Sequence, residues 1–230
     1  MTAREVYEYA LIELNKRKAP SLLLADYVYY INKAIQQYVN KMYNLYEVDQ
    51  QKSDDLKDLI VEDYEIVLSG NKGDLPDDYL HILKCISEYK VLSDNKCYKE
   101  DDIITFGTKR LTSDAETHIE NNYYFKPKFN QPYFKIRGKE IIIKWGSNPK
   151  FSLEKIYMDY IKTPSYIDLT QEQIDSVIDN SDELEFSEYV CQEIVNELVK
   201  LVLENSSDPR LQTNPIINQT ISNPGLANNK

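Results

Sequence analysis

Acidic residues, a histidine and a cysteine lie close together in the stretch GDLPDDYLHILKCISE. The carboxylates of Asp74, Asp77 and Asp78 have the chemistry to bind a hard cation such as calcium. Their spacing lacks the alternation of a calcium-binding loop, and Asp after Pro is common in turns. His81 and Cys85 are four residues apart, which provides too few ligands for zinc. We therefore predict no metal site and no cofactor, and we expect Asp77 and Asp78 to hold a turn before a strand.

A catalytic nucleophile is the second chemical possibility. Cys191 and His118 together would supply a thiol and a base, but Cys191 lies among apolar residues of a helical stretch, which favours a buried, inert thiol. The sequence contains no GxSxG, Walker-type, GxGxxG or HExxH motif, and its 6 glycines leave little material for phosphate-binding loops. We predict that the protein is not an enzyme and has no catalytic residues.

A basic aromatic stretch, NNYYFKPKFNQPYFKIRGK, is the one region with the chemistry of a nucleic-acid contact. Its cations alternate with aromatic rings, and this combination suits phosphates and stacked bases. The same alternation also places several of the cations on the solvent face of a hairpin, where they need no ligand. The candidate residues for contact with DNA, or for lining a DNA channel, are Lys126, Lys128, Lys135, Arg137, Lys139 and Lys144.

The composition limits the protein's class. The chain has 230 residues and a net charge of −11, which argues against a general nucleic-acid coat. Its 3 cysteines are far apart, so we expect free thiols in a reducing compartment. The amphipathic start has no apolar signal core, and no apolar run is long enough to span a bilayer. Its 19 tyrosines suit partly hydrated surfaces and subunit interfaces, because each has an apolar ring and a polar hydroxyl group.

Charge is segregated along the chain. Residues 121–163 hold nine Lys and Arg against three Asp and Glu, whereas residues 164–205 hold one against eleven, and residues 47–120 nine against nineteen. Surfaces of opposite sign suit repeated association of identical subunits, or a negative partner such as DNA for the basic region. They would equally neutralise each other as neighbours within the fold.

Periodicity predicts both helices and strands. Thr2 and Glu5 have the spacing of a capping box, and apolar residues recur every three or four positions over 24–46 and 183–204. Residues 83–91 alternate as a half-buried strand does, although a helix is also compatible there. The stretch YFKIRGKEIIIKW predicts a hairpin with Gly138 and Lys139 in a type II′ turn, which pairs Ile136 with Ile141 and Phe134 with Ile143.

These patterns predict an α+β fold, in which long N-terminal helices and a C-terminal helix form a helical bundle and an antiparallel β domain occupies the middle of the chain. We expect N-terminal helices of the bundle at 1–61, the β-rich domain at 62–168, C-terminal helices packing on the bundle at 169–205, and an extended C-terminal arm at 206–230. The arm has no periodicity and cannot bury a core of its own. Candidate assembly contacts in the arm are Pro209, Arg210, Leu211, Pro215, Ile216, Ile217 and Ile221.

Three stretches of the chain resemble a known family. LPDDYLHIL and YINKAIQQYVN are similar to segments of the head–tail adaptor or tail-tube ring proteins of short-tailed phages. The C-terminal stretch ELEFSEYVCQEIVNELVKLVLENSSDPRLQ resembles the ring proteins of crAss-like phages, and the whole chain is similar to them in size and order of elements. The resemblance implies a structural virion protein, a head-to-tail connector without catalytic residues.

The resemblance also implies particular partners. The protein is expected to form a homo-oligomeric ring of about twelve copies, to dock on the portal protein and to meet other tail ring proteins. DNA would pass through the channel that the ring extends. The expected location is the portal or tail vertex of the virion, after synthesis in the host cytoplasm, with no membrane partner. The alternative function is that of a DNA-binding accessory protein that uses the basic aromatic region 126–144.

Overall fold

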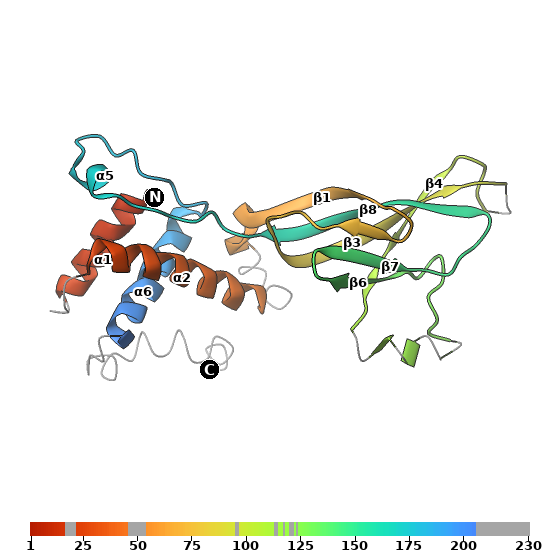
Figure 1. The fold of residues 1–230 in the computed structure, drawn as a ribbon, viewed down its shortest axis with the longest axis horizontal. Coiled ribbons are helices and arrows are strands. Elements are labelled where there is room, and N and C mark those ends of the chain that lie inside the picture. Colours follow the sequence, from red (N-terminus) through yellow and green to blue (C-terminus); the bar gives the residue numbers. More distant parts are fainter. Residues whose placement is uncertain are drawn as a thin grey trace, which may run out of the picture. The chain divides into compact units, whose positions relative to one another are not determined.

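The fold comes from a computed structural model that describes residues 1–16, 22–45, 54–94, 97–112, 115–116, 118–119, 122 and 124–205. The chain divides into two compact units (Figure 1). Unit 1 combines Met1–Leu59 with Pro164–Lys230, and unit 2 is the continuous segment Ile60–Thr163. Unit 1 is therefore built from both ends of the chain, and unit 2 is an insertion between them.

Unit 1 is helical, and its longer helices are amphipathic. Helix α6 contacts both α1 and α2, and the apolar stripes of all three helices are buried. The predicted capping box is confirmed, because the Glu5 N–H donates to Thr2 Oγ1 at 3.1 Å and the Thr2 N–H donates to Glu5 Oε2 at 3.0 Å. The described helices are α1 (Ala3–Lys16), α2 (Leu24–Tyr43), α5 (Gln171–Asp175), α6 (Glu188–Asn205) and the 3₁₀-helix η1 (Lys57–Leu59).

Hydrogen bonds join the N-terminal helices of unit 1 to its C-terminal part. The Ala3 N–H donates to the Asp182 carbonyl at 2.8 Å. The side-chain amide of Asn32 on α2 both donates to the Ile167 carbonyl at 2.7 Å and accepts from the Ile167 N–H at 2.9 Å. Ile167 lies in the connection before α5, and Asp182 lies in the connection between α5 and α6. Both connections have little secondary structure, so these bonds satisfy backbone groups that would otherwise lack a partner.

Unit 2 consists of two four-stranded sheets. The first has the strand order β1-β8-β3-β4, and the second has the order β2-β7-β6-β5. Adjacent strands are antiparallel except for β5, which pairs parallel to β6. The strands are β1 (Ile60–Val67), β2 (Lys72–Asp74), β3 (Tyr79–Val91), β4 (Ile103–Gly107), β5 (Lys109–Arg110), β6 (Tyr133–Arg137), β7 (Glu140–Lys144) and β8 (Phe151–Lys162).

One apolar core lies between the two sheets of unit 2. Phe134, Ile141 and Ile143 from the second sheet pack against strands β1, β3 and β8 of the first. In Figure 1, β6 and β7 lie beside the sheet that contains β3 and β8. The residues that complete the core are Ile66, Ile82, Cys85, Ile156, Met158 and Tyr160.

The β6–β7 hairpin has the predicted register. Ile136 pairs with Ile141, Phe134 pairs with Ile143, and Gly138 has a φ of 62°, the positive value that a type II′ turn needs at its first central residue. The strand prediction for residues 83–91 is also confirmed, because β3 includes them. A register shift between Ile82 and Lys84 moves the buried side chains of β3 from even to odd positions.

The predicted fold class is wrong. We expected a helical bundle built on long N-terminal helices, with an antiparallel β domain. The chain instead has two four-stranded sheets, and the second is mixed. The described residues contain only four α-helices, and α5 has five residues and buries none of them. Periodicity reports the apolar face of a helix but not how many helices share a core, and a two-residue strand such as β5 is too short to produce a pattern.

The sheet-to-sheet core predicts unequal effects at two neighbouring positions of β7. Ile143→Ala removes methyl groups from a fully buried side chain and should lower the free energy of unfolding of unit 2 by about 2–5 kcal/mol. Ile142→Ala, on the opposite and half-buried face, should cost clearly less. Urea unfolding followed by the fluorescence of Trp145, the chain's one tryptophan, measures both. Equal losses for the two variants would contradict the assigned faces.

Candidate functional site

The acidic turn before β3 serves the architecture of unit 2. Lys139 Nζ lies 2.9 Å from Asp77 Oδ1, and Tyr160 Oη donates to Asp78 Oδ1 at 2.9 Å. The Leu75 N–H donates to the Lys139 carbonyl at 2.9 Å, which ties the turn to the hairpin tip. The prediction that Asp78 holds this turn is confirmed, whereas Asp77 makes only a solvent-exposed ion pair with Lys139. No group of three or more His, Cys, Asp and Glu suited to a metal ion occurs in the described part of the chain.

His81 and Cys85 do not act as a pair. Both lie on strand β3, where residues four positions apart are separated by roughly 13 Å. Cys85 is buried in the core between the sheets, and this burial raises the pKa of its thiol to about 12. Burial and the neighbouring Arg110 lower the pKa of His81. On a helix His81 and Cys85 would share one face, but on this strand they are too far apart to bind one metal ion.

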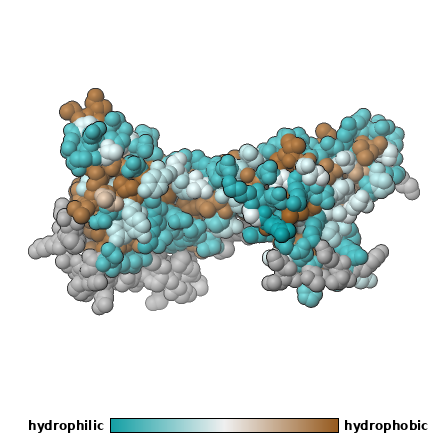
Figure 2. Space-filling model, in the orientation of Figure 1, coloured by the Kyte–Doolittle hydropathy of each residue, from teal (hydrophilic) through white to brown (hydrophobic). Residues whose placement is uncertain are grey.

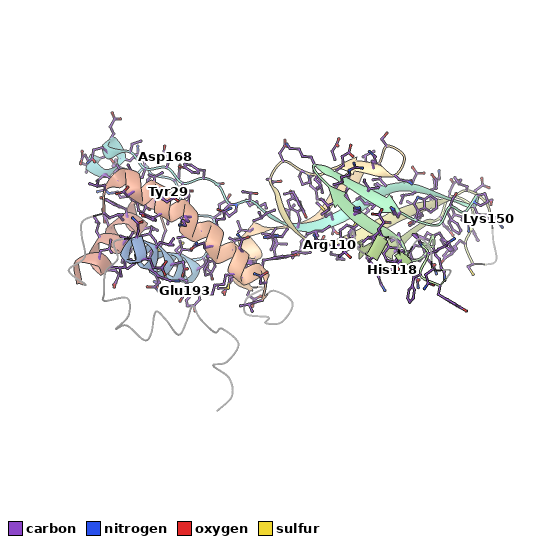
Figure 3. The ribbon with its side chains drawn as sticks, turned by 60° about the horizontal axis from the view of Figure 1, so that its bottom comes forward. Tyr29, Arg110, His118, Lys150, Asp168 and Glu193 are labelled. Carbon is purple, nitrogen blue, oxygen red and sulfur yellow. The ribbon has the colours of Figure 1, made fainter. Side chains whose placement is uncertain are left out.

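Cys191 and His118 belong to different units. Figure 3 labels His118 in unit 2 and Glu193, two residues beyond Cys191, on α6 of unit 1. The Cys191 thiol is buried and donates to the Phe186 carbonyl at 3.6 Å. Its burial raises the pKa of the thiol, which disfavours the nucleophilic thiolate.

Two of the six candidate cations form an internal ion cluster. Lys135 and Lys144 lie on the outer face of the β6–β7 hairpin, and both bind the carboxylate of Glu116, with Lys135 Nζ at 2.5 Å from Glu116 Oε2. Hydrogen bonds from Lys135 and Lys144 lower the pKa of Glu116 to about 2. The cluster joins the segment that carries Glu116 to the second sheet, so these two lysines already have an anionic partner.

The remaining candidate cations differ in their surroundings. Lys139 is exposed and pairs with Asp77 across the turn. Lys126, Lys128 and Arg137 are also exposed, and none of them forms an ion pair with any residue that the structure describes. The structure thus divides the predicted basic site into cations that hold the fold and cations that face solvent.

The loop that carries Lys126 and Lys128 is anchored on an aromatic cluster. Phe129 stacks on Phe151 with ring centroids 4.6 Å apart and meets Phe106 edge-on at 5.7 Å. At the start of the loop, the Asn122 carbonyl accepts hydrogen bonds from the backbone N–H groups of Phe125 and Lys126. The backbone of the loop also passes close to Gly146, where an added Cβ would lie 2.7 Å from the Pro127 carbonyl oxygen.

Two aromatic side chains project beside these cations. Tyr124 is 79% exposed and Phe125 is 59% exposed, although the loop beneath them is held by Phe129. We call Tyr124, Phe125, Lys126 and Lys128 the basic aromatic tip. Exposed aromatic rings on an anchored loop are typical of a surface that binds another macromolecule.

Sequence reasoning missed several residues of this region. The predicted site includes neither Glu116, the partner of the hairpin lysines, nor Gly146, the close-approach position. It also lacks the exposed rings of Tyr124 and Phe125. The signal for the tip was present in the sequence, since no Asp or Glu occurs between residues 121 and 139. The partnership of Glu116 had no local signal.

The seven candidate assembly contacts lie outside the described residues. They are Pro209, Arg210, Leu211, Pro215, Ile216, Ile217 and Ile221.

Comparison with known proteins gives no match, either to a family model or to a curated sequence. Among the described helices, none combines the length and the apolar character needed to cross a membrane.

The close approach at Gly146 predicts a specific loss of stability. Gly146→Ala should displace the loop from the aromatic cluster and lower the free energy of unfolding by about 1–3 kcal/mol. Gly107→Ala is the matched control, because an added Cβ there meets no atom within 4 Å, and its effect should stay within about 0.5 kcal/mol. Urea midpoints from Trp145 fluorescence test both variants. An unchanged midpoint for Gly146→Ala would show that the loop is not docked there.

The ion cluster predicts a pH dependence. Because the pKa of Glu116 falls from 4.5 to about 2 on folding, its stabilising effect should be complete above pH 4.5 and disappear as the pH falls towards 2. The difference in urea midpoint between the wild type and Glu116→Gln should therefore be largest near neutral pH and shrink between pH 4.5 and 2. A difference that does not change over this range would contradict the cluster.

Proposed function

We propose that this protein is a structural virion protein that joins the head of a phage to its tail. Copies of the chain form a ring, the ring docks on the portal protein and meets other tail ring proteins, and the channel through the ring conducts DNA. The role requires no catalytic residue and no cofactor. Its place is the portal or tail vertex of the virion.

The observation that carries this proposal is the exposure of large apolar side chains on well-held loops. In unit 2, Tyr124 and Phe125 project from the loop that Phe129 anchors. In unit 1, Val177 is fully exposed and Ile178 is 78% exposed, directly after α5. Neighbouring large apolar side chains that are this exposed are stabilised when another molecule covers them, as happens at the interfaces of a permanent assembly.

Two further features support a connector. The resemblance of the C-terminal stretch to crAss-like ring proteins points to this class. The exposed cations Lys126, Lys128 and Arg137 are suited to a negatively charged partner, which in a connector is either the phosphates of DNA in the channel or the acidic surface of a neighbouring copy. Lys135 and Lys144 are less suited to this contact, because Glu116 already neutralises them in part.

A second candidate function is that of a DNA-binding accessory protein. The specific observation in its favour is the basic aromatic tip, which places two cations beside two exposed rings. This function would require duplex DNA binding by the isolated chain that weakens steeply with salt.

Electron microscopy of the purified full-length chain, alone and mixed with the portal protein of its phage, tests the connector directly. We expect closed rings, or rings added to the portal. A chain that remains a single subunit under both conditions would contradict the proposal. Tight, salt-sensitive duplex binding by such a single subunit, abolished by Lys126→Glu with Lys128→Glu, would favour the accessory protein instead.

A further inference from the structure

Unit 1 carries an exposed apolar pair that the proposed function does not explain in detail. Val177 and Ile178, which we call the apolar knob, lie between α5 and α6 and project into solvent. Figure 2 shows hydrophobic surface at the end of unit 1 that carries α5. Two neighbouring aliphatic side chains at this exposure cost free energy in water, so a partner surface that covers them would stabilise the complex.

The knob is held in place by a network of hydrogen bonds. Arg4 Nη1 donates to the Ser176 carbonyl at 2.8 Å, directly before the knob. Directly after it, Asp179 accepts from Thr2 Oγ1 at 2.5 Å and from the Ser181 N–H at 2.9 Å. Hydrogen bonds from Ser181 and Thr2 lower the pKa of Asp179 to about 2. A loop fixed in this way loses little conformational entropy when a partner covers its tip.

The surroundings of the knob are acidic. No Lys or Arg occurs between residues 164 and 199. The side chains of Glu172, Asp175, Asp182 and Glu183, on both sides of the knob in sequence, are exposed. We call these four residues the acidic rim. A surface that receives the knob must therefore combine apolar area with positive charge.

The basic aromatic tip has that combination. Tyr124 and Phe125 supply exposed aromatic area, and Lys126 and Lys128 supply positive charge without an ion-pair partner among the described residues. No acidic residue in the 121–139 stretch offsets these charges. The knob and the tip are thus complementary both in apolar character and in sign of charge.

We propose that the apolar knob of one copy of this chain packs on the basic aromatic tip of a second copy. The inference rests on the proposed function, since it takes the partner to be another copy. The two surfaces differ, so the contact is heterologous, and any open chain of copies still offers one free knob at one end and one free tip at the other. Such a contact continues from copy to copy, and it gives a ring when the rotation from one copy to the next closes.

Complementary inactivation tests this contact. The knob variant combines Val177→Ser with Ile178→Ser, and the tip variant combines Tyr124→Ser with Phe125→Ser. In sedimentation velocity of the full-length chain, the wild type should assemble, and each variant alone should lose at least tenfold in association. An equimolar mixture of the two variants should form a dimer and nothing larger, because only one intact knob and one intact tip remain to meet.

Charge reversal provides an independent arm of the experiment. Lys126→Glu with Lys128→Glu makes the tip acidic, and replacing all four residues of the acidic rim by Lys (Glu172→Lys, Asp175→Lys, Asp182→Lys and Glu183→Lys) makes the rim basic. Each reversed variant alone should lose at least tenfold in association, because like charges then face each other. Their mixture should recover full assemblies, since both kinds of contact between the two variants again join opposite charges. Val67→Ser is the matched control, an exposed aliphatic residue on β1 whose loss should change nothing.

The possible results separate the two proposals. A wild type that never associates, alone or with portal, overturns the ring and this contact together. Association that survives in the knob and tip variants overturns the contact and leaves the ring intact. Variants that lose association but form no dimer on mixing show that knob and tip do not meet, which also overturns the contact. Tip variants that lose duplex DNA binding but keep association would assign the tip to nucleic acid instead.

Discussion

The core shared by the two sheets of unit 2 is the constraint on which its surfaces depend. Side chains alternate along a strand, so burying Phe134, Ile141 and Ile143 against the first sheet directs Lys135 and Lys144 to the outer face of the hairpin. Glu116 then binds both lysines. A stretch that reads as one basic patch is thereby divided, because the fold uses some of its cations and leaves Lys126, Lys128 and Arg137 exposed.

In both units a loop that is held by local contacts exposes large apolar side chains, and the proposed role in an assembly rests on this feature. Phe129 fixes the loop that exposes Tyr124 and Phe125, and Asp179 fixes the loop that exposes Val177 and Ile178. The residues that the sequence suggested for metal binding or nucleophilic catalysis are not on these exposed loops. Cys85 and Cys191 are buried with raised pKa values, and Asp78 holds a turn through its hydrogen bond with Tyr160. The groups that reach solvent are therefore suited to contact with large partners.

Local chemistry was predictable from the sequence, and long-range partnership was not. The capping box of Thr2 and Glu5 and the hairpin around Gly138 depend on residues a few positions apart, and both were predicted correctly. The predicted fold class was wrong, because the periodicity of apolar residues in the sequence reveals neither the parallel pairing of β5 nor how many helices share a core. Glu116 lies 19 residues from Lys135 and 28 from Lys144, and Gly146 meets Pro127 across a loop. Contacts of this kind are set by tertiary packing. The sequence therefore shows that the stretch is basic, but not which of its cations bind Glu116 and which remain exposed.

We propose that exposed surfaces of this chain bind other copies of the same chain. Native mass spectrometry of the purified full-length protein over a range of concentrations tests it most directly. We expect one discrete high-mass species at a whole-number multiple of the 27.0 kDa chain, and its share should grow at the expense of the single chain as the concentration rises. A spectrum with the single chain at every concentration, or with an open-ended ladder of sizes, would contradict a closed ring of identical subunits.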